Sequence, residues 1–174
     1  MADVLSTLIS EADLQARVDA LGVQIDADYG GEELLLVGVL KGSFLFLADL
    51  SKRLGTNVSI DFVQTSSYGG GKSSSGVVQI RKDLDINIEG KNVLLVEDIV
   101  DTGLTLTHLR ELLSVRKPKS LKVVSLLSKP EARVHKTQIE YVGFEIPNAF
   151  VVGYGLDYAE RYRNLPYIAI LQPE

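Results

Sequence analysis

The feature that most limits the fold of this chain is a continuous apolar run, LLLVGVL, at Leu34–Leu40. Charged residues and glycine bound this run, as is typical of a strand that is covered on both faces of a sheet. Two later segments, Val93–Ile99 (VLLVEDI) and Leu121–Leu127, are of the same kind. Segments with helical spacing of apolar residues lie between them, and such strand–helix–strand units require parallel pairing with right-handed crossovers.

The helical segments have recognisable ends. Ser10 and Asp13 have the form of a capping box, and the apolar residues that follow recur at helical spacing until Gly30. A second helical pattern, SFLFLADLSKRL, ends at Gly55, and a third ends at Val115. We therefore predict an α/β fold with a mostly parallel central sheet flanked by helices.

We predict a single domain over residues 1–174, because no repeat or linker divides the chain. Its C-terminal part, residues 141–174, alternates short strand-like runs with turns and is expected to form a small flanking hood lobe. The N-terminal segment is a further candidate for this lobe. Val58–Val63 and Val77–Ile80 have the composition of strands, and the Gly/Ser-rich stretch between them is expected to be a mobile loop.

The composition excludes several classes of protein. The chain has no cysteine and only two histidines, which excludes a disulfide framework, a thiol nucleophile and a cysteine zinc site. With 23 acidic and 18 basic residues, it is not expected to bind nucleic acid. The N-terminus lacks the basic region and long apolar core of a signal peptide, and Leu34–Leu40 is too short to span a bilayer. We expect no membrane contact and a cytoplasmic location.

The segment that carries the chemistry is VLLVEDIVDTGLTL, residues 93–106. An apolar strand ends in Glu97 and Asp98, and Asp101 opens a turn that leads into a helix. Ligands of open α/β sheets lie at the carboxyl ends of strands, and N–H groups at a helix N-terminus bind phosphate. Like charges about 4 Å apart repel by about 1 kcal/mol in water and about 4 kcal/mol at an effective dielectric constant of about 20. A cation or sugar hydroxyls would therefore stabilise these acids. The alternative interpretation is a solvated acidic turn that caps the helix.

Two common phosphate motifs are absent from the sequence. GGGKSSSG resembles a nucleoside-triphosphate loop, but Ser66 occupies the position of its first glycine and no helical pattern follows Lys72. No G-x-G-x-x-G sequence lies between a strand and a helix. The predicted anion site therefore belongs to another class.

The same segment resembles the ribose-phosphate-donor signature of the type I phosphoribosyltransferases: an apolar strand, two acids, two apolar residues, then Asp-Thr-Gly and a hydroxyl residue. Further blocks resemble the hypoxanthine-guanine branch of that family and follow its order. They are LKGS (Leu40–Ser43), SSYG (Ser66–Gly69), LLSKP (Leu126–Pro130) and VGFEIPNAFVVGYGLDYAERYRNLP (Val142–Pro166). The resemblance implies a purine-salvage enzyme, which transfers 5-phosphoribosyl from phosphoribosyl pyrophosphate to hypoxanthine or guanine and releases pyrophosphate.

The resemblance implies roles for the residues of the signature. Asp101 would be the general acid or base that faces N7 of the purine. Glu97 and Asp98 would hold the ribose hydroxyls and, with Asp157, a Mg²⁺ ion. The 5′-phosphate would be bound by the Asp101 amide, Thr102, Gly103, Leu104 and Thr105. Leu104 lies where some relatives carry lysine, and it would contribute its backbone.

Other blocks would bind pyrophosphate. Lys41 and Gly42 would bind it after the first long strand, and Arg163 would add a second contact, for which a guanidinium is well suited. Without the resemblance, Lys41 and Arg163 are ordinary surface cations. The neighbouring Arg161 is an alternative to Arg163.

The purine would be read by the C-terminal blocks. Lys129 would donate to the 6-oxo group, since an ammonium offers no acceptor. Phe150 would stack on the base, a contact worth about 1–3 kcal/mol. The backbones of Val151 and Asp157 would meet the edge of the base. Without the resemblance, Phe150 is more simply a core residue and Asp157 a turn cap.

The resemblance also implies that a loop containing Ser67 and Tyr68 closes over the site and excludes water. It further implies Mg²⁺ as cofactor, small-molecule substrates (phosphoribosyl pyrophosphate, 6-oxopurines and purine nucleotides) and a homodimer or homotetramer. The alternatives are a nucleotide-sensing regulator on the same fold and a xanthine-accepting purine phosphoribosyltransferase. The excess of acidic residues disfavours the regulator, which would need a basic face.

Overall fold

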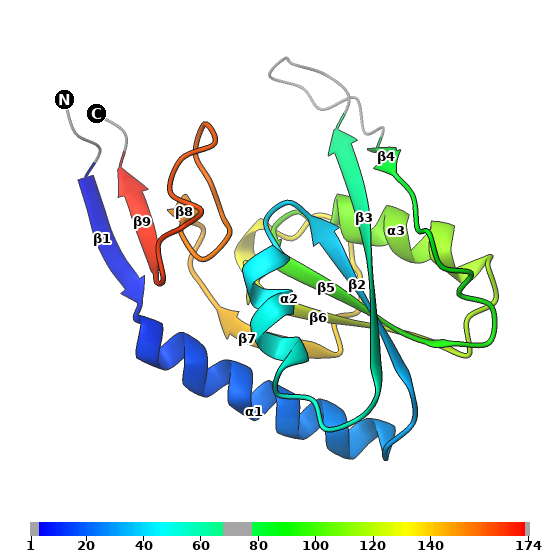
Figure 1. The fold of residues 1–174 in the computed structure, drawn as a ribbon. Helices are drawn as coiled ribbons and strands as arrows, with labels where there is room; N and C mark the ends of the chain where they lie inside the picture. The colour runs from blue at the N-terminus through cyan, green and yellow to red at the C-terminus, as the bar shows by residue number, and fades with distance from the viewer. Residues whose placement is uncertain (1–3, 68–77, 173–174) are drawn as a thin grey trace.

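The computed structural model describes residues 4–67 and 78–172 of the chain. A six-stranded sheet with the strand order β4-β3-β2-β5-β6-β7 forms its centre (Figure 1). The strands are β2 (Leu34–Leu40), β3 (Val58–Ser67), β4 (Val78–Lys82), β5 (Asn92–Val100), β6 (Ser120–Ser128) and β7 (Tyr141–Glu145). Neighbouring strands from β3 to β7 pair in parallel, and β4 pairs antiparallel with β3 at the edge. The predicted α/β fold with a mostly parallel central sheet is confirmed.

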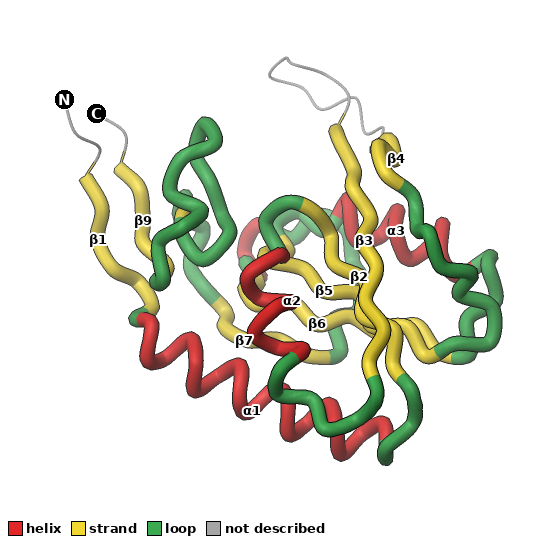
Figure 2. Tube along the Cα trace, in the orientation of Figure 1, coloured by secondary structure: helices red, strands yellow, loops and turns green. Residues whose placement is uncertain are grey.

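Helices cover both faces of this sheet (Figure 2). They are α1 (Glu11–Tyr29), α2 (Phe44–Ser51) and α3 (Leu104–Ser114), with a short 3-10 helix, η1, at Pro130–Ala132. Successive residues of β2 face opposite sides. Leu34 and Leu36 belong to the core cluster that includes α1 and α2, whereas Leu35 and Val37 belong to the cluster that includes α3. Burial on both faces explains why this strand has no polar residue.

The predicted ends of α1 are confirmed. The Ser10 hydroxyl accepts a hydrogen bond from the Asp13 N–H at 3.1 Å, and Gly30 follows the helix in a left-handed conformation with a φ of 58°. The second helix is shorter than predicted, since α2 ends at Ser51 and not at Gly55. The residues after Ser51 form the turn into β3.

A second, smaller sheet has the strand order β1-β9-β8, and both of its pairs are antiparallel. Its strands are β1 (Val4–Ile9), β8 (Val151–Val152) and β9 (Ile168–Gln172). The N-terminal strand therefore belongs to the flanking lobe, and both ends of the described chain lie in it (Figure 1). Within residues 4–67 and 78–172, no helix is long and apolar enough to cross a membrane.

The prediction that the flanking lobe begins at residue 141 is corrected: its C-terminal strands begin one strand later, at β8. β7 pairs in parallel with β6 and so completes the central sheet. Tyr141 is 2% exposed, and Arg17 of α1 donates to the carbonyls of Val142 and Gly143 at 2.7 and 2.8 Å. These contacts hold β7 in the central sheet, and the flanking strands begin with β8.

Gly143 permits the close approach of β7 to β6, since a Cβ atom there would lie 2.4 Å from the carbonyl oxygen of Leu126. We expect Gly143→Ala to lower the free energy of unfolding by about 1–3 kcal/mol, because the backbone must shift to admit a methyl group. Gly55→Ala is the matched control, since the nearest atom to its Cβ would be a carboxylate oxygen of Asp26 at 3.4 Å. Its free energy of unfolding should change by less than about 0.5 kcal/mol in urea denaturation. Equal stability of the two variants would contradict this account of β7.

Candidate active site

A pocket of about 230 Å³ lies at the carboxyl ends of β2 and β5 and at the N-terminus of α3. Residues 97–106 line it, together with Val39, Leu40 and Gly42. Parallel pairing aligns the ends of neighbouring strands, so the acidic tip of β5 meets the turn between β2 and α2 here. This is the edge of the sheet at which the sequence predicts a site.

The turn of residues 101–105 forms one wall of the pocket. Gly103 precedes α3 with a φ of 87°, and no side chain caps the helix. The N–H and the hydroxyl of Thr107 donate to the Gly103 carbonyl at 3.0 and 2.8 Å, and the N–H of Leu104 donates to the Thr102 hydroxyl at 3.3 Å. The first N–H groups of a helix lack partners within the helix. The turn therefore offers an anion both N–H donors and the positive end of the helix dipole.

The two carboxylates at the tip of β5 are adjacent in the chain, and burial raises the pKa of both. Glu97 is 5% exposed. Burial raises the pKa of Glu97 well above its ordinary value, and the neighbouring Asp98 carboxylate raises it further. Burial also raises the pKa of Asp98 to about 6, although the N–H of Ile99 and the charge of Arg163 oppose this rise. A cation or hydroxyl donors at this tip would stabilise the ionised pair.

Glu97 and Asp98 fit a magnesium ion, whereas Asp157 has other partners. Within the described residues, no group of three or more His, Cys, Asp or Glu side chains could hold a metal ion. Asp157 accepts from the Glu160 N–H at 2.9 Å and pairs with Arg163 at 3.0 Å, so it caps its turn. Mg²⁺ is commonly bound through one or two carboxylates together with substrate phosphates, which suits the acidic tip of β5.

Lys129 and Asp101 lie next to each other. Lys129 is the residue after β6, and it is only 6% exposed. Its Nζ lies 3.5 Å from Oδ2 of Asp101. The N–H of Lys129 donates to the carbonyl of Val100 at 3.0 Å, which ties the end of β6 to the end of β5. The fold thus brings together the predicted acid/base and the lysine predicted to read the purine.

Phe150 and Val151 lie at the start of the flanking sheet. Phe150 is 51% exposed, and its ring is nearly perpendicular to that of Tyr158, with centroids 5.7 Å apart. Val151 is buried and pairs with Ile170 of β9. The exposure of Phe150 excludes the alternative that it is a core residue, and its ring offers a surface on which a flat ligand can stack.

Glycines allow the flanking segment to touch the pocket. A Cβ atom at Gly42 would lie 1.7 Å from Oδ2 of Asp98, and one at Gly155 would lie 2.1 Å from the carbonyl oxygen of Gly42. Gly155 also has a φ of 102°, in the region that favours glycine. The turn after β2 is therefore held between the tip of β5 and the segment after β8.

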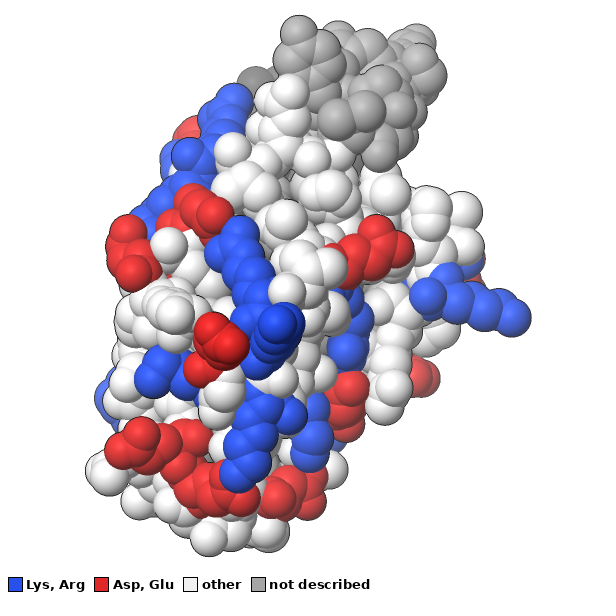
Figure 3. All heavy atoms as spheres, turned by 90° about the vertical axis from the view of Figure 1, so that its right-hand side faces the viewer, with Lys and Arg blue, Asp and Glu red and all other residues white. Residues whose placement is uncertain are grey.

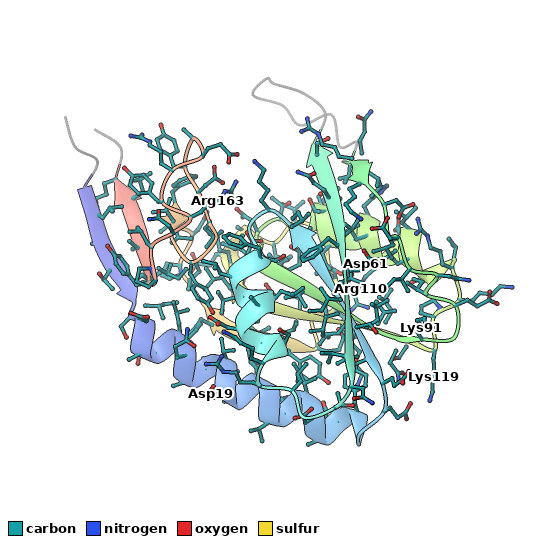
Figure 4. All side chains as sticks on the ribbon, viewed as in Figure 1. Asp19, Asp61, Lys91, Arg110, Lys119 and Arg163 are labelled. Atoms are coloured by element: carbon teal, nitrogen blue, oxygen red, sulfur yellow. The ribbon has the colours of Figure 1, made fainter. Side chains whose placement is uncertain are left out.

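The two cations predicted to bind pyrophosphate share one partner. Nζ of Lys41 lies 3.1 Å from one carboxylate oxygen of Glu160, and Nη2 of Arg163 lies 3.3 Å from the other. Arg163 also donates to the Gly155 carbonyl at 2.7 Å, and it lies between β8 and β9, beside the carboxyl-end edge of the central sheet (Figure 4). Arg161 instead lies over two tyrosine rings, 5.4 and 5.9 Å from their centroids. This arrangement favours Arg163 over Arg161.

Two predicted residues remain to be located, and two further residues near the site were not predicted. Ser67 is the last residue of β3, and Tyr68 lies outside the described residues. Two residues were not predicted: Glu160, which joins the two cations, and Arg133, which donates to the carbonyls of Val100 and Asp101. No local sequence signal marks the role of either residue, because Lys41 lies far from Glu160 along the chain and the carbonyls that Arg133 binds are also remote from it.

The raised pKa of Asp98 makes the stability of the metal-free protein depend on pH. Between its ordinary value of 3.8 and its native value of about 6, the native state binds more protons than the unfolded state. The free energy of unfolding therefore falls as the pH rises through this range. We expect Asp98→Asn to be more stable than the parent by about 1–3 kcal/mol at pH 7, with the difference nearly gone below about pH 4. Urea denaturation in a chelator measures this, and a parent that is the more stable at pH 7 would contradict it.

Comparison with known proteins identifies the family. A family model described as the phosphoribosyl transferase domain matches residues 10–159. The chain is 52% identical over 171 residues to the hypoxanthine-guanine phosphoribosyltransferase of Bacillus subtilis (strain 168), a match that covers 98% of this chain and 95% of that relative. It is 54% identical to the bifunctional protein TilS/HprT of Listeria innocua, but the match spans only 26% of that relative's length and 99% of this chain.

A solved structure agrees with these matches. The crystal structure of a hypoxanthine-guanine phosphoribosyltransferase from Bacillus anthracis has a TM-score of 0.92 with this chain at 52% sequence identity, covering 96% of this chain and 98% of that one. The parallel sheet, the acidic tip of β5 and the comparisons all lead to one assignment. The chain belongs to the phosphoribosyltransferase family, in its hypoxanthine-guanine branch.

Proposed function

We propose that this chain transfers the 5-phosphoribosyl group of phosphoribosyl pyrophosphate to hypoxanthine or guanine, giving IMP or GMP and pyrophosphate. The observation that carries the proposal is the proximity of Lys129 and Asp101, 3.5 Å apart at the ends of adjacent strands. Such a pair supplies a donor for a 6-oxo group and an acid/base next to a pocket suited to a sugar phosphate. The names of the relatives from Bacillus subtilis and Bacillus anthracis support the same reaction.

The donor would occupy the pocket at the tip of β5. Its 5′-phosphate would accept hydrogen bonds from the amides and hydroxyls of residues 101–105. Its ribose hydroxyls would donate to Glu97 and Asp98. Burial raises the pKa of both acids, and hydroxyl donors and a cation would stabilise their ionised forms.

The pyrophosphate would lie against Lys41, Gly42 and Arg163. Both cations now have Glu160 as a partner, so the incoming anion would replace this carboxylate. Mg²⁺, held by Glu97 and Asp98, would supply further positive charge to the leaving pyrophosphate. A contribution from Asp157 would require it to leave Arg163, with which it pairs at 3.0 Å.

The purine would stack on Phe150 and meet the backbones of Val151 and Asp157 with its edge. The Lys129 ammonium would donate to the 6-oxo group, and it has no acceptor for the amino group of adenine. As the bond from the anomeric carbon to pyrophosphate breaks and N9 of the purine bonds to that carbon, the Asp101 carboxylate would accept the proton from N7.

A nucleotide-sensing regulator on this fold is the alternative from another class. A regulator that binds nucleic acid would need a continuous basic surface. On the face seen in Figure 3, basic side chains lie among acidic ones.

We also propose, from the family resemblance, a cytoplasmic location and a homodimer or homotetramer.

The reaction is tested by incubating the protein with phosphoribosyl pyrophosphate, Mg²⁺ and, in turn, hypoxanthine, guanine, xanthine and adenine. We expect nucleotide and pyrophosphate in equal amounts from hypoxanthine and guanine, and none from adenine, because Lys129 offers only donors. Product from xanthine at the same rate would indicate the xanthine-accepting alternative. Binding of the donor without any product would favour the regulator.

The role of Asp101 is tested by Asp101→Asn. An amide cannot accept the N7 proton, so we expect kcat to fall by about 10²–10⁴-fold while the affinity for IMP stays within about threefold of the parent. Asp19→Asn is the control, because Asp19 lies on α1, pairs with Arg53 at 2.7 Å and is remote from the pocket (Figure 4). Turnover equal to that of the control would remove Asp101 as the acid/base.

A further inference from the structure

The carbonyls of residues 100–102, at the end of β5 and the start of the turn, are bound by one distant segment, residues 133–135. The guanidinium of Arg133 donates to the carbonyls of Val100 and Asp101 at 3.4 and 3.2 Å. The next two backbone N–H groups both donate to the carbonyl of Thr102, at 3.0 and 2.9 Å. Three consecutive carbonyls, that of the last residue of β5 and those of the first two residues of the turn, therefore have partners in this segment, and the Val100 carbonyl also accepts from the Lys129 N–H at 3.0 Å.

These bonds fix the direction of the N–H groups of the turn. In a planar trans peptide unit, the carbonyl and the following N–H point in opposite directions. Because carbonyls 100–102 point towards residues 133–135, the N–H groups of residues 101–103 point to the opposite side of the turn. Among the described residues that line the pocket, the turn contributes 101–105 and the segment 133–135 contributes none. The N–H groups therefore face the pocket, and the segment lies behind them.

The guanidinium of Arg133 is itself held in place. It donates to the hydroxyl of Ser128 at 2.9 Å, and Ser128, at the end of β6, is 4% exposed. Cδ of Arg133 lies close behind Gly103, where an added Cβ would be 2.9 Å from it. Arginine suits this place, because its planar group presents several N–H donors in a fixed fork, whereas a lysine ammonium is a single point of charge.

The direction of these peptide units decides whether an anion is attracted or repelled. An N–H that faces a phosphate oxygen donates to it, whereas a rotated unit would present its carbonyl oxygen and repel it. Bonds from behind hold the attractive orientation before the ligand arrives, so the ligand does not have to reorganise the turn.

We propose that Arg133 is a positioning residue, which holds the turn of residues 101–105 in its anion-binding orientation without touching the ligand. The inference rests on the proposed function in one respect, namely that this turn takes the 5′-phosphate while Lys41 and Arg163 take pyrophosphate. It follows that loss of the arginine fork weakens binding of the 5′-phosphate at the turn and leaves binding of pyrophosphate unchanged.

The test compares Arg133→Lys, which keeps the positive charge and loses the fork, with the parent. Calorimetry gives the Kd of IMP and the Kd of magnesium pyrophosphate. We expect the Kd of IMP to rise about tenfold, the size of one lost hydrogen bond to a charged group, and the Kd of pyrophosphate to stay within about twofold. Arg17→Lys is the matched control, because Arg17 also donates to two backbone carbonyls, at 2.7 and 2.8 Å, but on β7. Neither Kd should change in it.

Each other outcome decides against the inference. Unchanged IMP affinity in Arg133→Lys would mean that only the charge matters. An equal loss for both ligands would mean general damage to the fold. A parent that binds neither ligand would overturn the proposed function, and this inference with it.

A second variant covers a failure of Arg133→Lys to fold. Ser128→Ala removes the anchor of the guanidinium and leaves the arginine in place. We expect a Kd of IMP about threefold higher, from the loss of one neutral hydrogen bond, with pyrophosphate binding unchanged. IMP affinity equal to that of the parent would overturn the inference here too.

Discussion

Parallel pairing of β5 with both of its neighbours is the constraint on which the rest of this structure depends. Val96 lies opposite Gly38 of β2 and Val124 of β6, and further along the same strand Val100 lies opposite Ser128. With three strands in this register, their carboxyl ends open onto one edge of the sheet. The turn after β2, the acids of β5 and the lysine after β6 come from three separate parts of the chain and meet there for this reason alone.

In the site that results, two adjacent carboxylates at the tip of β5 have raised pKa values, whereas Lys41 and Arg163 lie at its margin. Glu97 and Asp98 are removed from water, which raises the pKa of each, while Lys41 and Arg163 lie on outer segments and have Glu160 as their partner. A ligand with hydroxyls at one end, phosphates at the other and an associated cation would stabilise the ionised carboxylates and would also give the two marginal cations an anionic partner. This complementarity is a physical reason for a sugar diphosphate to bind here, and it does not depend on the relatives' names.

Close backbone packing connects the flanking sheet to this site. Gly155 lies against the carbonyl of Gly42, and Gly42 lies against the carboxylate of Asp98. Beside this contact, the hydroxyl of Tyr154 donates to the carboxylate of Asp49 on α2. The segment that carries Asp157 and Arg163 is therefore fixed to the turn after β2 and to α2. Side chains at the two glycine positions would push these parts away from each other.

The sequence alone determined the elements whose signals are local. Structure is specified by neighbours a few residues away in the apolar run of β2, the cap at Ser10 and the glycine at the end of α1. In the same way, the acids at the tip of β5 predict a site for an anion and a cation. The family motifs added Lys129 and Phe150, which no local pattern distinguishes from ordinary surface or core residues.

Only the tertiary structure decided what depends on distance through space. It placed β7 in the central sheet, where Arg17 of α1 binds its carbonyls, and it set Glu160 between two cations from different segments. It also placed Arg133 against the carbonyls of Val100 and Asp101. The raised pKa of Glu97 belongs to the same class, because burial is a property of everything that packs around a side chain. Apart from the pairing of Glu160 with Arg163, these contacts join residues that are remote in the chain, and no short stretch of sequence contains both partners.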